Sequence, residues 1–329
     1  MAAEESSNVN LTSNDNNSGS NGPLELYYWY TSFYSRKVLF ALHEKRLHFK
    51  SNIVNLSKGE QYQPWYLKLN PRGEVPVLKD GVKVIPDSER IIDYLEDNFS
   101  NGSTPRLMPE KGTEETQHVK QMRELLDAVP VPLITFGCLY HHKLTTNMKI
   151  SSFERKQRLS FMSTVSINLD LMMEKYPEFK ELYQEKKQRF ETFRSDTQHE
   201  DKVKAVLDNL EGTLDTVEQE LASHEGDKSS WWLCSQKFAI PDITLALILH
   251  RLHELGLSAR YLTVDKRPHL VQYFKRVQER EGYKKTLGHG AGFLHKICCS
   301  KKKGVAAIGV AATVISVIAL GAVVYKRMK

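Results

Sequence analysis

The sequence predicts an α/β domain of thioredoxin-like order, then an all-α domain with a helical insertion, and finally one C-terminal transmembrane helix. Three observations support this fold class. Strand-like and helix-like apolar patterns alternate over residues 23–105, helical periodicity dominates residues 110–290, and residues 304–325 carry no charged side chain. A chain of 329 residues is long enough for two domains of ordinary size with tails.

The basic excess of the chain lies at its C-terminal end. The net charge is +6, but residues 296–329 hold seven basic and no acidic side chains, which leaves 39 basic against 40 acidic side chains elsewhere. Binding of nucleic acid by the folded body is therefore not expected, because it requires a basic surface. Residues 291–303 form a basic segment directly before the uncharged run.

The cysteines and the N-terminal residues indicate a cytosolic body with free thiols. Four cysteines are present, and they form neither a CxxC pair nor a Cys/His spacing that would bind zinc, so no metal site is expected. Residues 1–22 are rich in Asn and Ser, so we expect them to be disordered. They also lack the apolar run of a signal peptide, which places the body in the reducing cytosol.

The first half of the α/β domain is predicted from its apolar runs. Residues 24–30 (LELYYWY) indicate a buried strand, and residues 35–45 carry apolar side chains at helical spacing that would pack on it. Residues 52–56 indicate a second strand, which precedes a polar stretch around Pro64.

A hairpin and a helix complete this domain. The runs VPVL and VKVI flank Asp80-Gly81, a dipeptide typical of tight hairpin turns. Residues 88–99 then place apolar side chains along one face of a helix. The resulting order, β-α-β-α-β-β-α, is that of a thioredoxin-like domain.

This domain carries a family resemblance. The run NPRGEVPVLKDG, followed by PDSERIIDYL, resembles the glutathione-binding half of cytosolic glutathione transferases. The resemblance implies a cis bond before Pro76, so that the backbone next to it, at Val75, pairs with the peptide part of glutathione. It also implies that Asp87-Ser88 opens a helix whose hydroxyl and N–H groups receive the γ-glutamyl carboxylate. A simple helix N-cap is the alternative role of Asp87-Ser88, and both roles are compatible. Glutathione is therefore the ligand that the resemblance implies, and no cofactor is assigned.

The catalytic position of such transferases falls between the first strand and the first helix. It must hold the glutathione thiol as a thiolate, which needs a hydroxyl donor at a helix N-terminus. By its spacing to the following helix, Ser32 resembles the catalytic serine of the serine-type classes. Tyr30 or Tyr34 would resemble the tyrosine-type classes, with a poorer spacing. The alternative role of Ser32 is that of an ordinary helix cap.

Two departures from the family pattern indicate that the residues for binding glutathione are kept, whereas the activation of its thiol is impaired. Ser32 is followed by Phe33 and Tyr34, which would crowd the thiol, where a compact residue is usual. Glu74 stands where a neutral or basic residue is more usual, and it would repel the carboxylates of glutathione unless it is paired.

The second domain is predicted to be helical over residues 110–290. Residues 117–129 indicate a helix that Pro130 and Pro132 end. In the run FAIPDITLALILHRLHELG, Asp242 resembles the acidic residue that caps the buried central helix of the transferases. Ala239 replaces the usual capping hydroxyl, and Asp242 is assigned to folding rather than to catalysis.

Relative to the transferases, residues 144–200 form a charged, helical insertion. Two interpretations stay open. The insertion adds helices that lie on the core, or it forms an arm for a partner protein, including a cytoskeletal one, or for a second copy of the chain. A homodimer is therefore among the open options.

Residues 304–325 (GVAAIGVAATVISVIALGAVVY) are predicted to form a tail anchor in a lipid bilayer. A helix of 22 residues spans about 33 Å, against about 30 Å of hydrocarbon. Basic residues on both sides would lie among the lipid headgroups. Because only four residues follow the span, insertion would be post-translational and would leave the body in the cytosol. The alternative is a buried core helix of a soluble domain.

The target membrane and the function are predicted from the same segment and from a second resemblance. The span has a single leucine and basic flanks, which is typical of mitochondrial or peroxisomal anchors. Together with the transferase frame, the insertion and the runs TPRLMPE, RELLDAVP and KRPHL, it resembles the ganglioside-induced differentiation-associated protein 1 family. That resemblance implies a single-pass protein of the outer mitochondrial membrane, and of peroxisomes for some relatives, with roles in network shape, fission and redox handling.

The transferase resemblance and the predicted anchor together lead us to expect one of two functions. The first is a binding protein that regulates the mitochondrial network without classical catalysis. The alternative is an active, membrane-anchored glutathione transferase that acts on electrophiles or lipid peroxidation products.

Overall fold

The structure is a computed structural model that describes residues 22–287 except 101, 103 and 227–229. Apart from Gly22, the tail expected to be disordered lies outside these residues, as do the basic segment 291–303 and the anchor 304–325. Within the described ranges, none of the helices combines the length and the apolar character that crossing a membrane requires.

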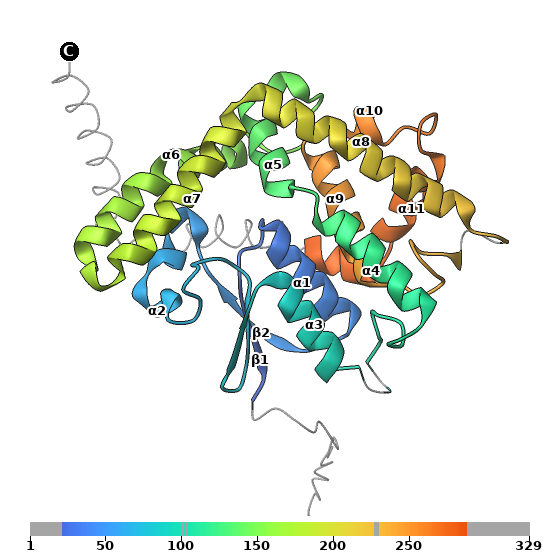
Figure 1. The fold of residues 1–329 in the computed structure, drawn as a ribbon, viewed down its shortest axis with the longest axis horizontal. Helices are drawn as coiled ribbons and strands as arrows, with labels where there is room; N and C mark the ends of the chain where they lie inside the picture. Colours follow the sequence, from blue (N-terminus) through green and yellow to red (C-terminus); the bar gives the residue numbers. More distant parts are fainter. Residues whose placement is uncertain (1–21, 101, 103, 227–229, 288–329) are drawn as a thin grey trace, which may run out of the picture. The chain divides into compact units, whose positions relative to one another are not determined.

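A four-stranded sheet forms the centre of the first domain, with the strand order β2-β1-β3-β4 (Figure 1). The strands are β1 (Leu24–Tyr28), β2 (Phe49–Ile53), β3 (Val77–Asp80) and β4 (Lys83–Pro86). β1 pairs in parallel with β2 and antiparallel with β3, which in turn pairs antiparallel with β4. This topology confirms the predicted thioredoxin-like domain. The hairpin also forms as predicted, with Gly81 at a φ of 57°, a conformation that glycine adopts without strain.

The helices of this domain pack on the sheet and on the second domain. They are α1 (Phe33–Glu44), α2 (Pro64–Leu67) and α3 (Ser88–Asn98), with the 3₁₀ helices η1 (Leu56–Lys58) and η2 (Glu60–Tyr62) before α2. α1 packs against α3 and against α9 of the second domain. It begins two residues earlier than predicted, because the Ser32 hydroxyl accepts a hydrogen bond from the Ser35 N–H and caps the helix. β2 also begins earlier, because Phe49 pairs with the first residue of β1.

The second domain is helical throughout its described part, as predicted. Its helices are α4 (Glu114–Asp127), α5 (Val131–Tyr140), η3 (His142–Leu144), α6 (Ser152–Lys175), η4 (Pro177–Phe179), α7 (Lys180–Gln198), α8 (Glu200–Ser223), α9 (Ile240–Glu254), α10 (Ser258–Tyr261) and α11 (Pro268–Gln278). Pro130 and Pro132 end α4, as predicted, and at the same time they flank the first turn of α5, where no intrahelical N–H donor is needed.

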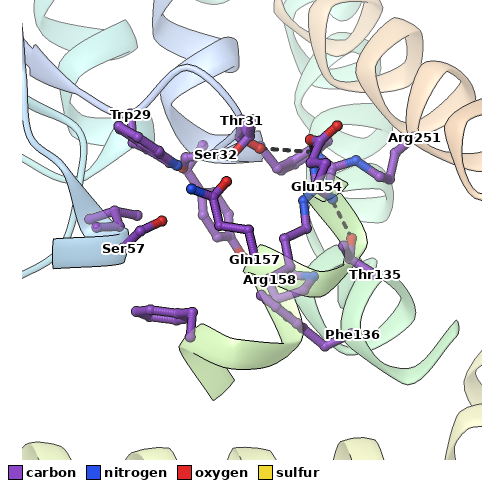
Figure 2. A pocket seen from close by; sticks show the side chains of 15 residues that line it. Trp29, Thr31, Ser32, Ser57, Thr135, Phe136, Glu154, Gln157, Arg158 and Arg251 are labelled. Atoms are coloured by element: carbon purple, nitrogen blue, oxygen red, sulfur yellow. Dashed lines mark hydrogen bonds and ion pairs between the residues drawn. The ribbon is translucent and has the colours of Figure 1, made fainter. Parts of the chain in front are cut away.

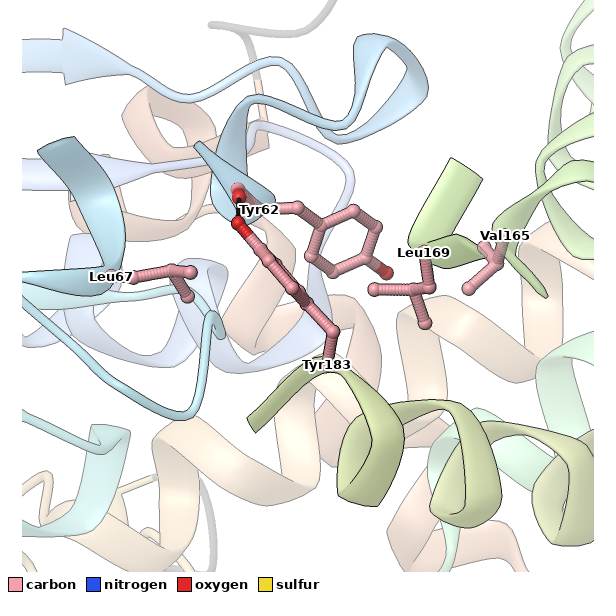
Figure 3. Close-up of a cluster of buried hydrophobic side chains, with 5 residues drawn as sticks. All are labelled: Tyr62, Leu67, Val165, Leu169 and Tyr183. Atoms are coloured by element: carbon pink, nitrogen blue, oxygen red, sulfur yellow. Dashed lines mark hydrogen bonds between the residues drawn. The ribbon is translucent and has the colours of Figure 1, made fainter. Parts of the chain in front are cut away.

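The insertion forms a helical hairpin of α6 and α7 that packs on the first domain. The two helices lie side by side, next to α2 (Figure 1). Their inward side chains form a buried cluster with the segment around η2 and α2 (Figure 3), made of Tyr62, Leu67, Val165, Leu169 and Tyr183. The Tyr183 hydroxyl donates a 2.7 Å hydrogen bond to the carbonyl of Tyr62, and the Lys186 ammonium donates one to the carbonyl of Arg72. The structure therefore agrees with the interpretation in which the inserted helices lie on the core.

We expect Tyr183→Phe to lower the free energy of unfolding by about 1 kcal/mol, the typical net value of one buried hydrogen bond. The ring would keep its place in the cluster, but the carbonyl of Tyr62 would lose its hydroxyl donor. Chemical denaturation followed by tryptophan fluorescence measures the change. Tyr176→Phe is the matched control, because its hydroxyl lies 3.4 Å from Gln63 and is only partly buried. Equal losses in the two variants would contradict a specific bond between α7 and the first domain.

Candidate functional site

A cavity of about 190 Å³ lies where the first domain, the helical domain and the insertion meet (Figure 2). The β1–α1 loop, η1, α5, α6 and α9 all contribute to its walls. Seven of its fifteen lining residues are aromatic or aliphatic, including Trp29, Phe33, Phe136 and Phe161, and apolar atoms make up most of its wall. Concave, mostly apolar sites with few polar groups are where small molecules bind in proteins. The cavity is thus the candidate site.

Ser32 lies in the wall of this cavity, at the N-terminus of α1. Its oxygen accepts from the Ser35 N–H at 3.3 Å, and its own O–H remains able to donate to a ligand. The helix-cap role is therefore realised. Its place at the N-terminus of α1 and in the wall of the cavity is as the sequence predicted for it, and a catalytic role stays a prediction.

The two alternative tyrosines differ in position. Tyr34 lines the cavity and is 41% exposed, whereas Tyr30 is buried against Trp29, with ring centroids 4.3 Å apart. Burial and the nearby carboxylates of Glu89 and Glu74 raise the pKa of Tyr34, and burial raises the pKa of Tyr30. Both phenols therefore stay protonated at neutral pH. Phe33 and Tyr34 both lie in the wall beside Ser32, where the sequence predicted crowding.

Glu74 is paired in the structure. Its carboxylate lies 3.2 Å from the guanidinium of Arg72, and both side chains are more than half exposed. An exposed pair of this kind is worth little to stability. The guanidinium of Arg72 does offset the negative charge of Glu74, which would otherwise repel the carboxylates of glutathione.

The backbone before Pro76 has the geometry that the transferase resemblance implies. The Val75–Pro76 peptide bond is cis, and both residues are buried. Within residues 22–287, as far as they are described, the N–H and C=O of Val75 make no hydrogen bond. An unpaired stretch of backbone of this kind can pair with a peptide-like ligand.

Asp87 and Ser88 begin α3. The Asp87 carboxylate accepts from the N–H groups of Glu89 and Arg90 at 3.0 and 3.2 Å, so the helix-cap role of this aspartate is realised. Asp87 has a φ of 76°, in the region that side-chain-bearing residues seldom adopt. Ser88 is the first helical residue and is 4% exposed. Its N–H has no partner within the helix, which is the feature that a ligand carboxylate would use.

A network of charged side chains that the sequence did not predict lies behind the Ser32 loop. Arg251 donates to the carbonyl of Thr31 at 3.0 Å and to the hydroxyl of Thr135 at 3.1 Å. Arg36 donates to the carbonyl of Tyr30 at 3.0 Å. Both guanidiniums contact Glu254, at 3.0 and 3.3 Å, and these cations hold the pKa of its carboxyl well below its usual range. One indication of this network was available, because charged residues occur in α9, a helix of which nearly all residues are buried, and buried charges need partners.

The insertion adds a second charged pair to the site. In α6 the guanidinium of Arg158 donates to the Glu154 carboxylate at 2.6 Å, and both side chains line the cavity (Figure 2). The predicted helical insertion contained no feature that singled out these two residues. Their place in the site depends on how α6 packs over α5.

Asp242 lies away from the cavity and is fully buried. Its carboxylate accepts from the N–H groups of Ala239 and Leu233 and from the Tyr273 hydroxyl, each at 2.8 Å. Burial raises its pKa to about 6. These contacts give it a structural role in holding the start of α9 to the preceding loop.

The part of the chain that the structure describes holds neither a cluster of metal ligands nor an activated cysteine thiol. No group of three His, Cys, Asp or Glu side chains there could hold a metal ion. Cys138 and Cys234 are buried as free thiols, and burial raises the pKa of Cys138 to about 12. A thiol with so high a pKa is a poor nucleophile at neutral pH.

Comparisons with known proteins agree with this fold. The chain matches the families described as "Glutathione S-transferase, N-terminal domain" over residues 26–104 and "Glutathione S-transferase, C-terminal domain" over residues 170–281. It is 37% identical to human ganglioside-induced differentiation-associated protein 1-like 1, over 80% of this chain and 74% of that one. It is 28% identical to glutathione S-transferase TCHQD of Arabidopsis thaliana, over 80% of this chain and 90% of that one.

Solved structures share the fold at low sequence identity. The beta-etherase LigF of Sphingobium sp. strain SYK-6 superposes with a TM-score of 0.58 at 22% identity, covering 82% of this chain and all of that one. Glutathione transferase F7 of Populus trichocarpa gives a TM-score of 0.55 at 20% identity, covering 80% and 97%. At this identity the likeness concerns the fold alone.

Proposed function

Because the chain belongs to the family of ganglioside-induced differentiation-associated protein 1-like proteins, which carry glutathione S-transferase domains, we propose that it works by binding rather than by conjugation. In this proposal it is a tail-anchored protein of the outer mitochondrial membrane, with its body in the cytosol and a share of it on peroxisomes. It regulates mitochondrial network dynamics, fission and redox handling.

One observation carries the preference for binding over conjugation. The space beside Ser32 measures about 190 Å³, smaller than the roughly 300–1,000 Å³ of typical small-molecule pockets. A conjugating enzyme must hold the glutathione thiol and an electrophile together in reacting distance. Residues of α6 form one wall of this space, and α6 is held in place by the buried cluster around Tyr62. The space beside Ser32, whose walls include none of Val75, Pro76, Asp87 and Ser88, thus has room for one small molecule.

The location and the partner of the protein are proposed from the sequence and from one exposed face. The uncharged span 304–325 with its basic flanks supports anchoring in a membrane, and the family resemblance supports a mitochondrial location.

On the outward face of α6, Phe153, Ile167 and Leu171 are 71%, 60% and 55% exposed. Exposed apolar side chains on one helix face support a partner protein, or a second copy of the chain, at the insertion 144–200.

An active glutathione transferase is the second candidate, and the first domain favours it. Ser32 stands at the start of α1, Val75 precedes a cis proline with its backbone unbonded, and Ser88 opens α3. These are the positions that the resemblance assigns to glutathione. The substrates in this case would be electrophiles or lipid peroxidation products at the membrane.

A conjugation assay separates the two candidates. We expect the full chain in lipid nanodiscs to conjugate glutathione to 1-chloro-2,4-dinitrobenzene no faster than buffer, and Ser32→Ala to change nothing. Ser151→Ala is the matched control, because Ser151 is also an N-cap serine, bonded to the Glu154 N–H at 3.1 Å, but does not line the cavity. Saturable conjugation that Ser32→Ala abolishes and Ser151→Ala leaves intact would establish the enzyme instead.

A further inference from the structure

Arg158 is a buried guanidinium with one unused donor group. Its side chain is 10% exposed, and Nη2 donates to Glu154. Nη1 is shielded from solvent and has no hydrogen-bond partner among the described residues. A buried donor without an acceptor costs about 1–3 kcal/mol, so the site favours an acceptor that the described residues do not supply.

Among the described residues, the charged groups in the wall of the cavity and directly behind it leave one cation in excess. Arg36, Arg158 and Arg251 contribute three guanidiniums, and their acidic partners are the carboxylates of Glu154 and Glu254. His250, which contacts Glu254, adds no charge at neutral pH, because burial lowers its pKa. An uncompensated buried cation favours an anionic partner. The acceptor that Arg158 lacks is therefore expected to carry a negative charge.

The rest of the cavity fits an aromatic ring. Trp29, Phe33, Phe136 and Phe161 line it, from the β1–α1 loop, α5 and α6. An apolar cavity of about 150 Å³ accepts benzene. A volume of about 190 Å³ therefore accommodates one ring with a short arm. Aromatic walls hold such a ring by offset or edge-to-face contacts.

We propose that this cavity binds a small aryl carboxylate, whose ring lies among the aromatic side chains and whose carboxylate pairs with the guanidinium of Arg158, a lining side chain that is 10% exposed. The proposal rests on the proposed function, in which the site beside Ser32 binds one molecule. The guanidinium comes from the inserted helix α6. The insertion therefore determines the ligand class as well as the size of the site.

The first test compares a charged and a neutral ligand on the unaltered protein. Isothermal titration of the full chain in nanodiscs with 3-phenylpropionate is expected to give saturable one-to-one binding. The alcohol 3-phenylpropan-1-ol, with the same ring and nearly the same length, is expected to bind at least tenfold more weakly. Equal affinities would overturn the role of the charge, and saturable binding of neither compound would overturn the site.

The second test uses variants of α6. Arg158→Met is expected to weaken 3-phenylpropionate binding at least tenfold and to leave the alcohol unaffected, and Arg158→Lys to restore part of the affinity. Lys156→Met is the control, an exposed cation of the same helix that does not line this cavity. Unchanged binding in Arg158→Met would overturn the proposal.

Gln157→Trp tests whether both ligands lie in this cavity, whereas unchanged binding of the alcohol by Arg158→Met shows that the arginine variant is folded. Gln157→Trp enlarges a lining side chain and leaves both arginines in place, so we expect it to weaken both ligands together. Binding that survives in Gln157→Trp would place the ligand elsewhere and overturn the proposal. Failure of the proposed function would look different, since it would appear as glutathione conjugation in the same nanodiscs, whether or not 3-phenylpropionate binds.

Discussion

Asp242→Ala is expected to lower the free energy of unfolding by about 3–5 kcal/mol, a large share of the roughly 5–15 kcal/mol that is typical of a folded protein. Its carboxylate is fully buried and satisfies the N–H groups of Ala239 and Leu233 and the Tyr273 hydroxyl. Each buried donor left without an acceptor costs about 1–3 kcal/mol, and water entering the gap recovers a part of that sum. Chemical denaturation followed by tryptophan fluorescence measures the loss.

Asp87→Asn is the control for this prediction. Asp87 also accepts two backbone N–H groups at a helix start, but it is exposed, and asparagine caps helices about as well as aspartate. We expect a change within about 0.5 kcal/mol. A similarly small change in Asp242→Ala would mean that the start of α9 does not depend on this carboxylate.

The stability difference between the unaltered protein and Asp242→Ala is expected to depend on pH. Burial raises the pKa of Asp242 to about 6, above the value of 3.8 for an unperturbed carboxyl. Between about pH 4 and pH 6 the folded protein therefore retains a proton that the unfolded chain has released, and stability from this group falls as the pH rises. The difference in stability between the unaltered protein and Asp242→Ala should accordingly shrink over that window and stay level above it.

Deletion of residues 304–329 is expected to move the protein from the membrane to the cytosol. A span of 22 uncharged residues reaches across about 30 Å of hydrocarbon, and no helix within the described residues could replace it. After alkaline carbonate extraction the full chain should stay in the pellet and the truncated chain in the supernatant. An N-terminal fluorescent fusion should change from a mitochondrial to a diffuse pattern.

A charge placed in the span offers a gentler test. Ile315→Arg puts a guanidinium near the middle of residues 304–325, which costs about 2.5–3.5 kcal/mol on insertion scales, while Ile315→Leu should insert normally. In cells lacking the protein, we expect Ser32→Ala to restore network shape and the deletion variant to fail. A truncated chain that still collects on mitochondria would assign targeting to another segment.

Much of the first domain could be predicted because its signals are local. The hairpin at Asp80-Gly81 and the helix that begins after Asp87 follow from residues within a few positions of one another. Some helix boundaries differ from the prediction. The first helix begins at Phe33 because Ser32 caps it, and apolar spacing does not report such a bond.

The two-domain class, the family, the positions of Ser32, Pro76 and Ser88, and the predicted anchor at 304–325 could all be inferred from the order of amino acids alone. That α6 and α7 close over the first domain, and that Arg158 lines the cavity, became apparent only in the folded molecule. The contact between Arg36 and Glu254, which are 218 positions apart, also became apparent only there. Apolar period and turn chemistry act between near neighbours, whereas the pairing of charges depends on which helix faces pack together, and that arrangement exists only once the chain has folded.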